Sequence, residues 1–167
     1  MLRLIPALLI VASCGCPHRP AGPAEPLPPE QIGAILDGLS LAALSAPVEA
    51  PEACAASRAV GAGLAAAADV ARAEGALLPP ISVDVSGCGL ALAEGRPEAG
   101  DAQAAVDAVL GVAIVAAASV RDCRARGWLV ASIGWVRGAA PAIIAEIAEP
   151  SGAIAIEGAA VDLGGCE

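Results

Sequence analysis

The chain has 167 residues, of which 57% are hydrophobic and 16% charged, and its formal net charge is −9. This length suits one domain of ordinary size, and the acidic balance argues against a surface that binds nucleic acid. Phe and Tyr are missing, and Ala dominates the apolar residues. Because Lys is missing as well, Arg is the residue that supplies the positive charges.

The first fourteen residues have the pattern of an export signal that ends in a lipid-attachment site. A basic residue follows close behind the initiating Met, residues 4–12 are apolar, and two small residues precede Cys14. The apolar stretch is too short to span a bilayer as a helix. The motif Val11-Ala12-Ser13-Cys14 resembles the lipobox of bacterial lipoproteins.

This resemblance implies that residues 1–13 are a signal peptide, that Cys14 receives the lipid, and that the mature protein is anchored in the bacterial envelope. Because Gly15 rather than Asp follows Cys14, the resemblance also favours the outer membrane in a cell that has one. The alternative is an ordinary secretory signal or an uncleaved anchor, in which Cys14 has no role.

Residues 14–29 form a spacer that is rich in Pro, with Ala, Gly and charged residues. Such a composition favours an extended, polyproline-like chain and cannot form a core. At about 3.1 Å per residue, the spacer holds the domain up to roughly 40 Å from the bilayer.

From residue 30 onward the apolar residues recur at helical spacing, which predicts a mainly α domain over residues 30–167. We expect an Ala-rich bundle of about four helices. The expected helical regions are Glu30–Ser45, Pro51 to about Gly75, Asp101 to about Cys123, and Trp128–Val136 together with Ala140–Ala148.

Two segments do not follow the helical period. Residues 81–85 alternate as a strand does, and residues 90–93 are a candidate partner in a short β-hairpin. Residues 153–156 are a candidate for a further short strand.

Four cysteines remain in the domain once Cys14 is acylated and Cys16 is assigned to the spacer. In an exported chain, Cys54, Cys88, Cys123 and Cys166 suggest two disulfides, with three possible connectivities. If the second and third helices are antiparallel neighbours, Cys54 pairs with Cys123 and Cys88 with Cys166.

Trp128 and Trp135 are seven residues apart, on one helical face, next to a cluster of three arginines that includes Arg124 and Arg126. One interpretation is a face that docks a partner protein or a membrane surface. The other, which we favour, is that both rings fill the core, because they are the only aromatic side chains available.

The sequence offers no catalytic or cofactor site. Its only histidine, His18, lies in the spacer, so neither a catalytic triad nor a metal site can be assembled around it. The string Gly61-Ala62-Gly63 resembles part of a dinucleotide fingerprint, but it follows a helical segment rather than a strand. Close packing between helices explains these glycines better, and we expect neither a cofactor nor a metal ion.

The sequence therefore predicts a non-enzymatic binding or structural module, whose partners are the membrane and another envelope protein. A second topology stays open. Residues 102–148 contain two long apolar stretches around a basic loop, which is also the pattern of a transmembrane hairpin in a membrane-embedded accessory protein. An envelope enzyme is a third alternative.

Overall fold

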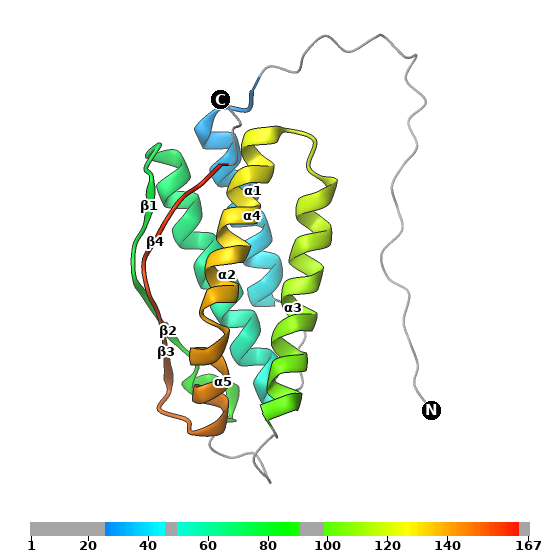
Figure 1. Cartoon of the computed structure of the whole chain (residues 1–167), viewed down its shortest axis with the longest axis vertical. Coiled ribbons are helices and arrows are strands. Elements are labelled where there is room, and N and C mark those ends of the chain that lie inside the picture. The colour runs from blue at the N-terminus through cyan, green and yellow to red at the C-terminus, as the bar shows by residue number, and fades with distance from the viewer. Residues whose placement is uncertain (1–25, 46–49, 91–98, 164–167) are drawn as a thin grey trace, which may run out of the picture.

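The computed structural model describes residues 26–45, 50–90 and 99–163 (Figure 1). Its helices are α1 (Pro29–Ser45), α2 (Pro51–Arg72), α3 (Ala99–Ser119), α4 (Cys123–Gly138) and α5 (Ala140–Ala148). Its shorter elements are β1 (Leu77–Leu78), β2 (Ile81–Asp84), the 3-10 turn η1 (Ser86–Cys88), β3 (Ala153–Ile156) and β4 (Ala159–Ala160). The predicted helical bundle with a short antiparallel strand pair is confirmed. The predicted signal peptide, Cys14 and most of the spacer lie outside the described residues.

The four long helices pack side by side, and a two-stranded ribbon runs along one flank of the bundle (Figure 1). α1 and α2 are antiparallel neighbours. The chain then returns along the bundle through β1 and β2, so α3 runs in the same direction as α2 (Figure 1). α4 runs antiparallel to α3, and α5 continues it after a bend of 41°.

The ribbon keeps one register over its whole length. Leu77 lies opposite Ala160 at one end and Asp84 opposite Ala153 at the other. The ladder is interrupted at Pro79-Pro80 because neither residue has an N–H to donate. The strands expected at residues 81–85 and 153–156 are therefore present, but they pair with each other. The described partner of residues 81–84 is thus 153–156, whereas residues 91–93 of the expected hairpin partner lie outside the described part.

The boundary between the third and fourth helices also differs from expectation. We predicted that the third helix continues to about Cys123 and that the fourth begins at Trp128. Instead α3 ends at Ser119 and α4 begins at Cys123. The Asp122 side chain explains this start, because its Oδ1 accepts a hydrogen bond of 2.7 Å from the Ala125 N–H and so caps the helix.

Small side chains bring the helices close together in a core that contains much Ala. An added Cβ at Gly61 would lie 2.6 Å from Leu44 of α1, and one at Gly63 would lie 2.5 Å from Val136 of α4. Both glycines therefore serve helix packing, as the sequence suggested, and not a dinucleotide. The largest fully buried side chains include Ile32, Leu36, Leu129, Ile143 and Ile147.

The disulfide pairing that we predicted is wrong. Cys54, in the first turn of α2, is bonded to Cys88 of η1, with the two Cα atoms 5.6 Å apart. Our prediction assumed that α2 and α3 are antiparallel. The strands instead return the chain to the start of α2, which places Cys88 beside Cys54. Cys123 is disulfide-bonded as well, and its partner lies outside the described residues.

The two ends of the domain meet at the start of α4. The Leu27 N–H donates a hydrogen bond of 3.2 Å to Asp122 Oδ2, so the spacer enters the domain there. An added Cβ at Gly127 would lie 3.1 Å from the carbonyl oxygen of Leu163, so the last described residue lies there too. We call this end of the bundle the entry pole.

Within the described part of the chain, no single helix has both the length and the apolar composition needed to cross a membrane. The bent pair α4 and α5 together meets these criteria.

Candidate binding face

The structure separates the aromatic and basic residues that the sequence grouped into one possible partner face. Trp128 and Trp135 are only 2% and 7% exposed, and the Trp135 indole N–H donates to the carbonyl of Glu157. Both rings therefore fill the core, and the interpretation that placed them on a docking face is wrong. Arg124 and Arg126 stay at the surface of α4, where they have different surroundings.

Glu146 is the one buried carboxylate among the described residues, and it fixes a turn. Its Oε1 accepts hydrogen bonds from the backbone N–H groups of Ser151 and Gly152, and its Oε2 accepts one from the Ser151 hydroxyl. Burial raises the pKa of this carboxyl, but these hydrogen bonds outweigh burial and lower the pKa below its usual value. Both oxygens are thus engaged in holding the connection from α5 to β3.

Asp84 has a similar local role at the end of β2. Its Oδ1 accepts from the hydroxyl of Ser86 at 2.7 Å and from the backbone N–H of the same residue at 2.9 Å. These bonds lower the pKa of the Asp84 carboxyl. Among the described residues, no group of three or more His, Cys, Asp and Glu side chains lies close enough together to hold a metal ion.

α3 differs from the other helices because it carries apolar side chains on all sides. Val106 and Leu110 are buried, yet Val112 is 74% exposed and Val115 is 72% exposed, with Ile114 also at the surface. A helix that is apolar all round normally lies inside a protein or a membrane. The exposed side of α3 is therefore a candidate binding surface.

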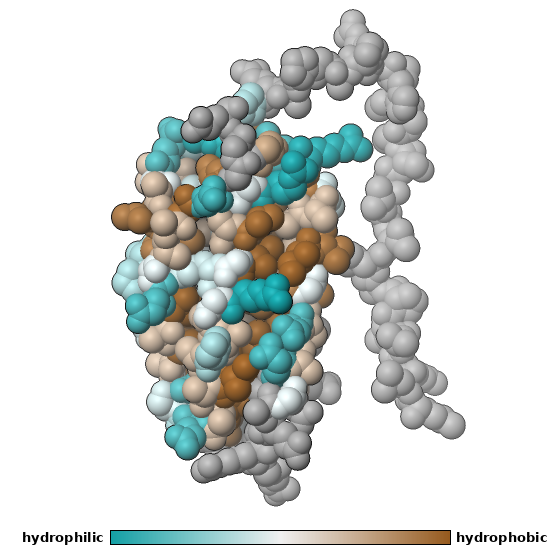
Figure 2. Space-filling view, in the orientation of Figure 1, coloured by the Kyte–Doolittle hydropathy of each residue, from teal (hydrophilic) through white to brown (hydrophobic). Residues whose placement is uncertain are grey.

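A groove of about 400 Å³ lies between α3 and α4. Figure 2 shows this face of the molecule, with apolar side chains along its centre and hydrophilic ones crossing and bordering them. The groove is lined by six apolar or small residues and two arginines: Ile114, Ala117, Ala118, Val130, Ile133, Gly134, Arg126 and Arg137. We call this the α3–α4 groove.

The cations beside the α3–α4 groove are not neutralised by the described part of the protein. Arg124 forms an ion pair with Glu74 at 3.4 Å, and Arg72 pairs with three carboxylates. By contrast Arg121, Arg126 and Arg137 form no ion pair with any described residue. α4 contains no acidic residue, so its surface is cationic on a protein whose net charge is −9, while α3 contributes the exposed Asp107.

A second hollow of about 230 Å³ lies on the other side of α3, among α1, α2, α3 and α4. Its lining is apolar apart from Ser57, whose hydroxyl donates a hydrogen bond of 2.6 Å to the carbonyl of Ala43. Ile133 lines both hollows. α3 is therefore flanked by apolar hollows on two sides.

No known protein family, curated protein or solved structure matches this chain. Its candidate site therefore rests on the geometry of the chain itself. Sequence reasoning grouped Arg126 with Arg124 and the two tryptophans, and it missed the groove. The sequence did show that α3 is apolar on all its sides, but we interpreted this pattern as a possible transmembrane segment and not as one side of a groove.

Proposed function

We propose that the protein is a lipid-anchored component of the bacterial cell envelope that acts as a non-enzymatic binding module, and that the α3–α4 face is its binding surface. The lipid on Cys14 supplies the anchor and residues 14–29 supply the tether. The folded bundle then presents the groove to molecules at or near the membrane.

One observation carries the choice of surface: exposed apolar side chains and cations without an ion pair among the described residues line the same groove. Ile114 and Val130 line it and are 47% and 59% exposed, although apolar surface is more stable when removed from water. Arg126 and Arg137 border this groove without an ion-pairing partner among the described residues. A binding surface typically has such an apolar centre with polar groups around it.

The anchor is tested by labelling growing cells with an alkyne-bearing palmitate. The natural chain is expected to carry the label on Cys14 and to fractionate with membranes, whereas the Cys14→Ser variant is expected to lose the label. An unlabelled natural chain, with its thiol free, would refute the proposed anchor.

The same variant distinguishes the membrane-embedded alternative, which the apolar surroundings of α3 and the bent α4–α5 pair keep open. Alkaline carbonate releases proteins that are held only at the surface of a membrane. If the bundle forms as described, Cys14→Ser chains whose leader has been removed are expected in the soluble fraction. A transmembrane hairpin over residues 102–148 would keep them in the pellet.

A further inference from the structure

We infer that the α3–α4 groove is a site for a single-chain anionic amphiphile, whose acyl chain lies along the groove and whose carboxylate or phosphate contacts Arg126. This inference rests on the proposed function and specifies its ligand. Three features of the groove support it: its apolar length, its charge and its position in the domain.

The groove has the length of a hydrocarbon chain and an apolar lining. Arg126 and Arg137 both line it and are eleven residues apart on α4, which corresponds to roughly 16 Å along the helix. The other residues that line the groove are apolar or small. An extended methylene chain laid along this length buries apolar surface, and an anionic group at its end can reach a guanidinium.

The floor is suited to such a chain because its central residues are small. Ala117 and Ala118 line the α3 side, and Gly134 lines the α4 side. An added Cβ at Gly134 would meet nothing within 4 Å, so the space above this residue is open. The exposed row Arg126, Val130, Gly134 and Arg137 then runs along one side of the proposed chain.

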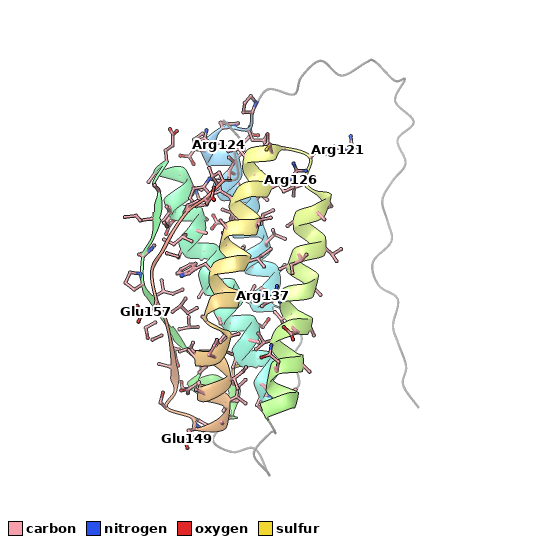
Figure 3. The ribbon with its side chains drawn as sticks, viewed as in Figure 1. Arg121, Arg124, Arg126, Arg137, Glu149 and Glu157 are labelled. Atoms are coloured by element: carbon pink, nitrogen blue, oxygen red, sulfur yellow. A yellow bond between two sulfur atoms is a disulfide. The ribbon has the colours of Figure 1, made fainter. Side chains whose placement is uncertain are left out.

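The charge of the groove selects an anionic headgroup. Arg121 and Arg126 lie at the same end of the bundle, and Arg137 lies farther along the groove (Figure 3). None of the three forms an ion pair with a described residue. A guanidinium binds carboxylate and phosphate oxygens through paired hydrogen bonds. We assign the headgroup to Arg126 because Arg121 adds a second cation at that end, whereas the aliphatic stem of Arg137 covers the chain.

The position of the headgroup end favours a ligand that comes from the membrane. The spacer enters the domain through the hydrogen bond between Leu27 and Asp122, next in sequence to Arg121. The cationic end of the groove therefore lies at the entry pole, where the proposed tether holds the domain to the bilayer.

The test uses the natural chain in membranes isolated from its own cells. These are incubated with a palmitate that bears a diazirine and an alkyne, and are then irradiated. The expected result is a light-dependent adduct on the tryptic peptide 127–137. The mass of the adduct shows whether the free fatty acid or a phospholipid made from it was bound. Adducts spread evenly over exposed peptides would overturn the inference.

Two matched substitutions test the groove itself. Gly134→Leu places a side chain in the groove, while Gly38→Leu places the same side chain on the exposed part of α1, where an added Cβ also meets nothing within 4 Å. The adduct is expected to fall at least about tenfold with Gly134→Leu and to persist with Gly38→Leu. Equal adduct in both variants, with both folded by circular dichroism, would overturn the inference.

The charge requirement is tested separately, so that the conclusion does not depend on Gly134. Adducts are compared on the tryptic peptide that contains residues 127–136, because substitution of Arg126 or Arg137 removes a cleavage site. Arg126→Gln is expected to lower the adduct by about tenfold, Arg137→Gln less, and Arg124→Gln not at all, because Arg124 is paired with Glu74 outside the groove. A diazirine-bearing hexadecanol of the same length is expected to label the groove weakly. Equal labelling by the alcohol and the acid would contradict the role of Arg126.

The two proposals fail in different ways in this experiment. Label that reaches Cys14 in living cells needs no light, and its absence counts against the lipid anchor. Label on peptide 127–137 needs light, and its absence counts against the amphiphile site alone. A light-dependent crosslink from this peptide to a polypeptide, with no lipid adduct, would show that the face docks a protein and would overturn the inference.

Discussion

The hairpin of α1 and α2 and the pair of α3 and α4 each contain one Ala-rich helix, yet they are held in very different ways. Polar side chains join α1 to α2: the Ser40 hydroxyl donates to the carbonyl of Gly61 at 2.8 Å, and Arg72 forms ion pairs with Glu30 and Asp37. The Cys54–Cys88 disulfide adds a covalent link at the start of α2. α3 has hollows on two sides and exposed valines.

This difference indicates that the two pairs of helices have different roles in one small domain. The first pair of helices, with the ribbon and the disulfide, forms a fixed scaffold. α3 gains less from packing, because part of its apolar surface faces water or empty space. Binding surfaces are commonly drawn from the less stable parts of a fold, and an occupant of the groove would complete the packing of α3.

The largest expected effect contrasts apolar side chains in the two regions. Leu36→Ala in α1 removes a fully buried side chain and is expected to lower the free energy of unfolding by about 2–5 kcal/mol. Val112→Ala in α3 is expected to change it by less than about 0.5 kcal/mol, because Val112 is largely exposed. Chemical denaturation of both variants measures the contrast. Equal losses would show that α3 is packed as tightly as α1.

Next in size is the effect of the disulfide in the scaffold. Cys54→Ser together with Cys88→Ser opens a link between residues separated by 34 positions and is expected to cost about 2–4 kcal/mol. Thermal unfolding with and without reductant measures this effect. Peptide mapping without reduction is expected to find Cys54 joined to Cys88, and a Cys54–Cys123 peptide would contradict the topology described here.

A smaller effect is expected at Glu146, which fixes the turn from α5 to β3. Glu146→Gln replaces an ionised acceptor of several hydrogen bonds and is expected to cost about 1–3 kcal/mol at pH 7. The folded-state pKa of Glu146 is lowered, so the stabilisation is complete above the ordinary Glu pKa. It disappears as the pH falls through the folded-state pKa. The two proteins should therefore converge in stability in acid, and a constant difference would refute the ionised role.

The smallest effect compares glycines of the two regions. Gly134→Ala is expected to raise the free energy of unfolding by about 0.5–1 kcal/mol, because the position is helical and an added Cβ meets nothing within 4 Å. Gly63→Ala is expected to lower it, since the Cβ would lie 2.5 Å from Val136. Melting temperatures of the two variants give the signs. A destabilising Gly134→Ala would show that the groove is closed in solution.

The helices were predictable from the sequence because their apolar residues recur at steps of three and four, and Pro51 marks a helix start. The start of α4 after Asp122 was missed. The strands at residues 81–84 and 153–156 were also found, since Val83 and Ile154 belong to alternating patterns. Their pairing was not predictable. It depends on the parallel course of α2 and α3, and no local pattern encodes the direction of a distant helix.

The binding face was less predictable for a related reason. Periodicity identifies a buried side only when the opposite side is polar, and α3 is apolar all round. The sequence therefore could not separate the buried side chains of α3, such as Val106, from an exposed one such as Ile114. The tryptophans illustrate the converse case, because their spacing is compatible with a surface stripe although both rings lie in the core.

The meeting of Leu27 and Leu163 beside the start of α4 has a practical consequence for protein engineering. A domain whose two ends emerge together can be placed within a surface loop of another protein without stretching its host. Residues 27–163 can therefore be inserted into a surface loop of a fluorescent protein. This fusion would display the bundle and leave the end opposite the entry pole unobstructed.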